Sequence, residues 1–208
     1  MSEPYIVDPG LETGLALSGF SLRALELNSA VIYILDPHFR ISYCNLAWDH
    51  FASQNGGESL LRKRVTDSPC MEAISPLLRA FYESAFRLVA RTQKPWEHDY
   101  ECSSPETSRV FHMRVLPLHG ERLLIENSLL VESPHKHGRA PDGSRYIGED
   151  GYIAMCGNCR RVLARDAVGK SVWEWVPAYL VSMPAPVTYG FCDTCLPYYL
   201  GIDMITSG

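Results

Sequence analysis

Two pairs of closely spaced cysteines limit what the C-terminal part of this chain can fold into. Cys156 and Cys159 form one C-x₂-C pair, and Cys192 and Cys195 form a second. Each pair can present two thiolates from one tight turn, and two pairs supply the four soft ligands of a tetrahedral structural zinc site. We therefore expect one structural Zn²⁺ to be bound by these four side chains.

Other uses of paired cysteines fit this spacing less well. A redox dithiol of the thioredoxin type needs a single pair beside a βαβ pattern. Iron–sulfur clusters also use four cysteines, but these usually lie closer together than the 32 residues that separate Cys159 from Cys192. Attachment of a c-type haem needs a histidine after the second cysteine, where Arg160 stands. Zinc is the preferred interpretation over these three alternatives.

The C-terminal module, residues 151–208, is too short to bury a large core without help. A structural zinc ion stabilises such a fold by about 10 kcal/mol or more at neutral pH. Its aromatic residues are expected to pack around the metal, with any exposed remainder serving as a docking surface. These residues are Trp173, Trp175, Tyr179, Phe191, Tyr198 and Tyr199.

A predicted domain boundary precedes the C-terminal module. Residues 132–150 are rich in Pro, Gly, Ser and charge and show no hydrophobic period, which predicts a linker. The preceding segment alternates between strand-like and helix-like patterns. Asp36 and Pro37 predict a hairpin turn, and Asn45 suits the N-cap of a helix. The elements expected are strands 30–35 and 40–44, a helix after Asn45, a long helix at 74–91, and strands 96–102, 109–118 and 122–130.

This order predicts an α+β domain with one antiparallel sheet and helices over one face. The run AVIYILDPHFRISYCNLAWDHF resembles the opening of a PAS sensory domain. The long helix ending at Lys94-Pro95 and the three closing strands also match the order of that family. The resemblance covers residues 21–131, and it implies that Asp36 and Asn45 are the turn residue and the helix cap of a PAS fold.

The C-terminal sequence carries a second resemblance. MCGNCRRV, WEWVPAYL and TYGFCDTCLPYYL are similar to a Cys₄ module that follows PAS domains in some bacterial signalling proteins. The match includes Trp173-Glu174, Tyr179 and Gly190. Tyr189 stands where that family's pattern has a histidine, so a histidine role is not carried over. The resemblance implies a sensor domain followed by a zinc-binding module.

A PAS cavity would lie between the sheet and the helices. Alternation along 96–102 places Trp96, His98, Tyr100 and Cys102 on one face, expected to point inward. These side chains either fill the core, which is the default, or hold a small organic ligand without a covalent bond. A haem sensor, with His98 or His112 as an axial ligand of the iron, is an alternative, and a flavin sensor is another. The predicted lining is Trp48, Phe51, Phe86, Trp96, His98, Tyr100 and His112.

Composition narrows the function classes. The net charge is −5, and residues 151–208 carry four basic and four acidic residues, which argues against nucleic acid as a partner. A transcription-associated regulator that uses the zinc module for nucleic-acid or polymerase contact is the alternative. No catalytic motif appears, so a non-enzymatic signalling protein with a protein partner is expected. The chain ends at Gly208, so no output domain is expected after the module.

Location and assembly complete these expectations. The first 20 residues lack a basic, apolar signal peptide, and no apolar run is long enough to span a bilayer, which predicts a cytoplasmic protein. Seven cysteines in a reducing compartment are then thiols or metal ligands. Leu22, Leu25 and Leu27, together with an uncovered outer sheet face, are expected to form a two-fold homodimer.

Overall fold

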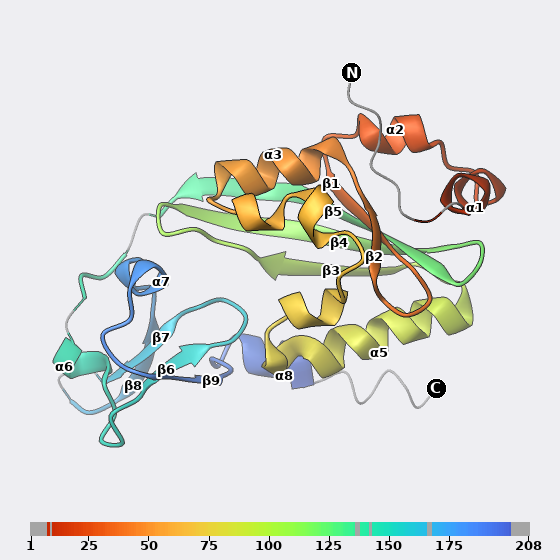
Figure 1. Cartoon of the computed structure of the whole chain (residues 1–208). Coiled ribbons are helices and arrows are strands. Elements are labelled where there is room, and N and C mark those ends of the chain that lie inside the picture. Colours follow the sequence, from red (N-terminus) through yellow and green to blue (C-terminus); the bar gives the residue numbers. More distant parts are fainter. Residues whose placement is uncertain (1–7, 9, 136–137, 142, 166–167, 201–208) are drawn as a thin grey trace. The chain divides into compact units, whose positions relative to one another are not determined.

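The computed structural model describes residue 8 and residues 10–135, 138–141, 143–165 and 168–200 (Figure 1). The chain divides into two compact units, which are described separately. The first unit comprises Met1–Ile74, Tyr82–Asp99 and Phe111–Leu130. The second comprises Ser75–Phe81, Tyr100–Val110 and Val131–Gly208, so it includes the first turns of a long helix and the tip of a hairpin.

A five-stranded sheet of order β2-β1-β5-β4-β3 organises the first part of the chain (Figure 1). Strand β1 pairs antiparallel with both β2 and β5, and Ile34 lies opposite Tyr43 on one side and Leu124 on the other. The predicted strands are confirmed, although β5 continues beyond the predicted end. The strands are β1 (Val31–Leu35), β2 (Ile41–Cys44), β3 (Trp96–Glu101), β4 (Thr107–Leu118) and β5 (Arg122–Pro134).

The turn between β1 and β2 is held by one carboxylate, as the sequence predicts. Asp36 Oδ1 accepts hydrogen bonds of 2.8 Å from the backbone N–H groups of both His38 and Arg40. Phe39 adopts a left-handed conformation with φ of 59°, which a non-glycine residue rarely does. The Phe39 ring is nevertheless buried, and its edge-to-face contact with Phe86, at a centroid distance of 5.9 Å, helps to fix the turn.

Asn45 is the central polar residue of the first unit. Its Oδ1 accepts from Trp48 N at 3.1 Å, which caps helix α3 (Leu46–Gln54) as predicted, and also from Ile32 N at 3.1 Å. Its Nδ2 donates to the carbonyls of Leu25, Asn28 and Ala30 at 2.9 to 3.2 Å. The side chain is fully buried, so these bonds replace water entirely. One residue thereby joins the entry of β1, the end of β2 and the start of α3.

Helices cover the face of the sheet that carries Tyr33 and Leu35. Tyr33 meets Trp48 of α3 edge to face at 5.5 Å, and Phe86 of the long helix α5 is 1% exposed. Apolar residues recur along α5 at helical spacing, as predicted, and the helix ends before Lys94-Pro95. The elements on this segment are α3 (Leu46–Gln54), η1 (Glu58–Leu60), α4 (Arg62–Val65), η2 (Cys70–Ala73) and α5 (Pro76–Thr92).

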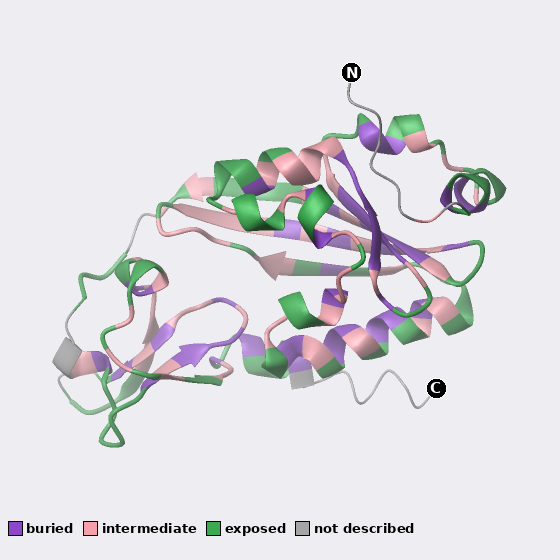
Figure 2. Ribbon diagram, in the orientation of Figure 1, coloured by how far each residue is buried: buried purple, intermediate pink, exposed green. Residues whose placement is uncertain are grey.

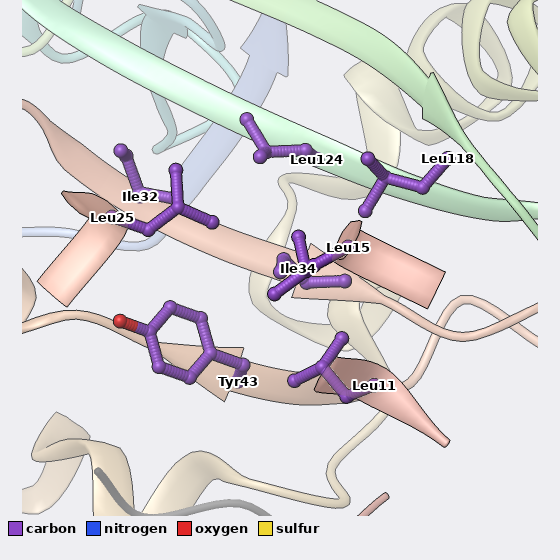
Figure 3. Close-up of a cluster of buried hydrophobic side chains, with 8 residues drawn as sticks. All are labelled: Leu11, Leu15, Leu25, Ile32, Ile34, Tyr43, Leu118 and Leu124. Carbon is purple, nitrogen blue, oxygen red and sulfur yellow. The ribbon is translucent and has the colours of Figure 1, made fainter. Parts of the chain in front are cut away.

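The opposite face is partly covered too, which corrects the expectation of an uncovered outer face. Helices α1 (Leu11–Leu17) and α2 (Leu22–Glu26) pack Leu11, Leu15 and Leu25 against Ile32 and Ile34 of β1. Figure 3 shows these side chains with the rest of the cluster. Leu25, assigned from sequence to a dimer surface, is therefore buried within its own domain. The full cluster is Leu11, Leu15, Leu25, Ile32, Ile34, Tyr43, Leu118 and Leu124.

A buried ionic network fastens α2 to its surroundings. Glu26 and Arg62 are 6% and 8% exposed, and Arg62 Nη1 lies 2.6 Å from Glu26 Oε1. Tyr43 donates its hydroxyl to Glu26 Oε2 at 2.6 Å, and Arg62 Nε also pairs with Asp49 Oδ2 at 3.0 Å. Each buried charge thus has more than one partner, which is the condition for tolerating ions in a core.

The second unit contains a four-stranded sheet of order β8-β7-β6-β9. Tyr146, Ile153, Met155, Val162 and Val176 belong to its separate apolar core. Figure 2 colours the buried parts of the chain purple, including stretches of β6 and β7. The predicted linker is shorter in the structure, because β5 runs to Pro134 and the buried Tyr146 belongs to this core. The elements are α6 (Gly143–Tyr146), β6 (Ile153–Cys156), β7 (Val162–Arg165), β8 (Ser171–Glu174), α7 (Ala178–Val181), β9 (Val187–Gly190) and α8 (Cys195–Leu200).

None of the helices formed by the described residues combines the length and the apolar character that crossing a membrane would require.

Candidate metal centre

Parallel pairing of two strands brings the cysteine pairs together. In the register of β6 and β9, Ile153 lies opposite Val187 and Cys156 lies opposite Gly190. Because parallel strands end at the same edge of a sheet, the first pair begins at the end of β6 and the second follows directly after β9. A hydrogen bond of 2.8 Å from Gly157 N to the Gly190 carbonyl closes this edge. The long sequence separation therefore becomes a short distance in space.

The four sulfur atoms of Cys156, Cys159, Cys192 and Cys195 all lie within 4.8 Å of one another. All four side chains are buried, with Cys156 fully inaccessible and Cys195 6% exposed. Cys159 Sγ and Cys192 Sγ are 3.6 Å apart, far beyond the length of a disulfide bond, and all seven cysteines are free thiols. The fold thus brings four cysteine sulfur atoms close together without a disulfide bond.

This geometry fits a tetrahedral metal ion. Zinc–sulfur bonds of about 2.3 Å in a tetrahedron place neighbouring sulfur atoms about 3.8 Å apart. The observed separations are close to that value, so a small contraction of the widest pairs would complete the coordination. All four positions would be taken by protein, which is typical of a structural site rather than a catalytic one. The residues present therefore fit the group that the sequence predicts.

The first cysteine turn differs in detail from the expectation that Gly157 relaxes it. The left-handed residue is Arg160, with φ of 62°, and the turn is closed by Cys156 N donating to the Arg161 carbonyl at 2.8 Å. Gly157 serves a close approach instead, because a Cβ there would lie 2.9 Å from Cδ2 of Leu77, also in the second unit. The glycine lets this neighbouring side chain pack directly on the turn.

An outer layer around the sulfur atoms is formed by Asn158, which sequence reasoning missed, and by Tyr199, which it expected to pack around the metal. Asn158 Nδ2 donates to Cys195 Sγ at 3.3 Å, and Tyr199 donates its hydroxyl to Asn158 Oδ1 at 2.7 Å. Tyr199 in turn stacks on Phe191 at 5.3 Å and meets Phe81 edge to face at 4.9 Å. Hydrogen bonds to ligand atoms orient them and tune metal affinity. The two residues have no distinctive spacing in the sequence.

The thiols differ in proton affinity. A hydrogen bond with Cys159 lowers the pKa of Cys156 to about 4, and the same bond raises the pKa of Cys159. Burial raises the pKa of Cys195 to about 12. Metal binding to such a set replaces protons on the sulfur atoms, so it releases protons and weakens as the pH falls.

The aromatic residues of the module have separate surroundings. Tyr179 lies in the module core, and Tyr199 and Phe191 stack beside the cysteines. Trp173 and Trp175 line a cavity elsewhere in the second unit. Tyr198 is 49% exposed. The expectation that all six aromatics surround the metal therefore needs correction for the two tryptophans.

Within the first unit, the aromatic residues predicted to line a cavity are brought together in pairs. Trp48 contacts Tyr33, Phe51 meets Phe111 edge to face at 5.6 Å, and Phe86 lies beside Tyr82. Trp48 and Phe51 are only half-buried, whereas Phe86 is fully buried. The Trp48 indole N–H donates to the Leu60 carbonyl at 2.6 Å. Close aromatic pairs of this kind are typical of a packed core.

The predicted inward placement on β3 matches the structure for Trp96 and His98, whereas Cys102, predicted on the same face, is exposed. Trp96 and His98 stack at 5.3 Å, and both contact Tyr82 of α5. His98 is 4% exposed, and burial lowers its pKa to about 4. Tyr100, assigned to the second unit, is half-buried.

His112 lies on the opposite, charged face of the sheet, which departs from the predicted lining. Its Nδ1 is 2.6 Å from Asp99 Oδ1, and its Nε2 is 3.7 Å from Glu97 Oε2. Glu97 and Asp99 alternate along β3 with Trp96 and His98, and alternate residues of a strand point to opposite faces. The two histidines proposed as haem ligands are therefore not on one face.

Comparison with known proteins identifies the first part of the chain. Residues 25–126 match the sequence model of the PAS fold family. A search among curated proteins found no match. Solved structures with similar folds include the PAS domain of the quorum-sensing receptor RpfR from Cronobacter turicensis, in complex with C12:0. That structure is 18% identical, has a TM-score of 0.40, and the match covers 50% of this chain and 96% of that one.

A second similar structure is the PAS domain of nitrogen regulation protein NR(II) from Vibrio parahaemolyticus. It is 18% identical, has a TM-score of 0.37, and the match covers 53% of this chain and 99% of that one. A domain of a sensory box histidine kinase/response regulator from Geobacter sulfurreducens is 15% identical, with a TM-score of 0.39 and coverage of 50% and 88%. On the family match and the strand order, residues 25–126 are a PAS domain.

Proposed function

We propose that this chain is a non-enzymatic, cytoplasmic signalling protein in which a PAS domain works together with a module built around one structural Zn²⁺. The observation that carries the zinc assignment is the convergence of four buried thiols within 4.8 Å. Four thiolates with no place for water suit Zn²⁺, which has no redox chemistry and accepts tetrahedral geometry without strain. None of the seven cysteines forms a disulfide, which accords with a reducing compartment.

Signalling through protein contacts is supported by the surface beside the second cysteine pair. Tyr189, Leu196 and Tyr198 are 50%, 44% and 49% exposed. Aromatic side chains such as the two tyrosines are enriched where proteins meet. The balanced charge of the module favours a protein over a nucleic acid as the partner. Strand β9 and helix α8, which flank the second cysteine pair, thus expose these side chains to the proposed protein partner.

Metal analysis tests the zinc assignment. Elemental analysis of the purified chain should return one zinc per chain and no stoichiometric iron. Cys192→Ser should lose most of the zinc and melt the module, while near-UV signals of the PAS domain persist, because the metal supplies stability that the small core lacks. Absorbance of the same sample in the haem and flavin regions tests the alternative sensor chemistry.

Cys102→Ser is the matched control. Cys102 is exposed and lies outside the four-sulfur cluster, so this variant should keep its zinc. Stoichiometric iron, a disulfide within either pair, or equal zinc content in the two variants would each show that the zinc proposal is wrong.

A further inference from the structure

The second unit contains a cavity of about 780 Å³ whose lining does not include the four cysteines. Its wall includes His135 and two tryptophans. Trp173 lies on strand β8, and Trp175 is the first residue after that strand. Small-molecule sites usually measure 300–1,000 Å³ and combine aromatic walls with a few polar groups. The size and wall of this cavity meet that description.

The aromatic wall is held in place by backbone hydrogen bonds. The His135 ring lies 4.4 Å from the Trp175 ring at an interplanar angle of 31°. His135 Nε2 lies 2.9 Å from the Ser104 carbonyl, and the Trp175 carbonyl accepts from Arg139 N at 2.8 Å. The His135 ring is thus fixed by its own hydrogen bond and Trp175 by its backbone, so this pair loses little freedom when another planar group packs on it.

Two carboxylates, Glu101 and Glu174, and two guanidiniums, Arg139 and Arg161, line the cavity, but they are not paired one to one. Arg145 Nη2 and the Tyr146 hydroxyl both donate to the Glu174 carboxylate at 2.9 Å. Arg139 Nε lies farther from the same carboxylate, at 3.5 Å. Burial, together with the bond to Glu174, raises the pKa of Tyr146 to about 12, so this hydroxyl stays a donor. The guanidinium of Arg139 is therefore only weakly paired, and it is 63% exposed.

A second guanidinium lies at the same cavity. Arg161 Nη1 is 3.4 Å from both carboxylate oxygens of Glu101, longer than an ordinary charged hydrogen bond. Arg145, which lies outside the cavity lining, pairs with Glu174, and Arg161 pairs with Glu101, which leaves Arg139 as the surplus guanidinium among these five groups. A planar guanidinium binds a carboxylate through two parallel N–H donors.

We propose that this cavity binds a small aromatic carboxylate, with the ring against Trp175 and His135 and the carboxylate on Arg139. The ligand needs both properties, because the wall selects a flat π surface and the surplus guanidinium selects one negative charge. All of its lining residues belong to the second unit, and the site gives the zinc module a recognition role beyond that of a folded support.

Binding of simple probes to the zinc-loaded full chain tests this assignment. Isothermal titration calorimetry should detect phenylacetate, with phenylacetamide binding about tenfold more weakly because the charge is gone. Cyclohexylacetate, which keeps the charge but lacks the ring, should bind at least about threefold more weakly. Phenylacetate should also shift the indole N–H resonances of Trp173 and Trp175 rather than that of Trp48.

Two arginine variants locate the charge contact. Arg139→Gln should weaken phenylacetate binding about tenfold. Arg165→Gln, which changes a 69% exposed arginine that pairs with Glu149, should change it less than about twofold. Zinc content confirms that both variants are folded. No binding by zinc-loaded protein, equal affinities for acid and amide, or unchanged affinity in Arg139→Gln would each overturn the proposal.

Discussion

At the scale of single residues, the first unit depends on a buried amide. Asn45 caps α3 and also binds three carbonyls that precede β1. Replacing it with Ala removes the cap and leaves buried backbone groups without partners. Asn45→Ala should therefore lower the free energy of unfolding by about 3–5 kcal/mol, measured by urea denaturation.

Asn55→Ala is the comparison for this prediction. The Asn55 side chain is exposed and donates to the Phe51 carbonyl at the end of α3. Its removal should cost about 0.5 kcal/mol or less. Similar losses in the two variants would mean that the Asn45 network adds nothing beyond an ordinary helix cap.

His98 makes stability depend on pH. Burial lowers its pKa in the folded chain to about 4, whereas an unfolded histidine titrates near 6.5. Between these values the unfolded state takes up a proton that the folded state does not, so stability should fall as the pH drops from about 6.5 to 4. The loss from this residue is at most about 3 kcal/mol.

Urea denaturation at several pH values isolates this contribution. His98→Phe keeps a ring beside Trp96 and should show a shallower decline in unfolding free energy below pH 6.5. His38→Gln, which changes an exposed histidine in the β1–β2 turn, should follow the wild-type curve. If the curves of His98→Phe and the wild type run parallel, His98 is not the cause of the acid sensitivity.

At the scale of elements, the N-terminal helix α1 contributes to the PAS domain core. Leu15 is 1% exposed and packs in the cluster with Ile34 and Leu118, whereas Leu17 on the same short helix is 64% exposed. Leu15→Ala should reduce the free energy of unfolding by about 2–5 kcal/mol, and Leu17→Ala by less than about 0.5 kcal/mol. Equal effects in urea denaturation would show that α1 does not pack as described.

Sequence reasoning identified the elements whose pattern is local. The alternation along β3 placed Trp96 and His98 on one face, and the spacing of apolar residues located α5, because each pattern follows from the geometry of a single element. It missed α1, since seven residues carry too little periodicity to distinguish a helix.

The metal centre shows the same division between local and distant information. The C-x₂-C spacing alone named the four sulfur atoms, since each pair forms one turn. Asn158 and Tyr199 could not be assigned in the same way, because their contact joins positions 41 residues apart and depends on how α8 folds back. Likewise, the partners of Asn45 lie up to 20 residues away.

At the scale of the whole molecule, we predict a two-fold homodimer. Leu25 is buried within the chain, but Leu17 and Leu27 remain 64% exposed near the ends of α1 and α2. Light scattering should report twice the mass of 23.4 kDa. Replacing both leucines with Glu should shift the mass toward the monomer, because charges are costly in an apolar contact.

Leu60→Glu serves as the reference for this substitution, since Leu60 is 51% exposed on a different element of the same unit. It should leave the mass of the assembly unchanged. A monomer mass for the wild type at high concentration would contradict the dimer, and dissociation by all three substitutions alike would contradict this surface.

The parallel pairing of β6 and β9 has a consequence for how such modules diversify. The two cysteine turns are held by the register of these two strands, while β7, β8 and α7 form the excursion between them. Lengthening or exchanging that excursion adds little closure entropy, because the cost grows only with the logarithm of its length. The two cysteine pairs can thus stay in place while the length or sequence of the intervening segment, which carries both cavity tryptophans, changes.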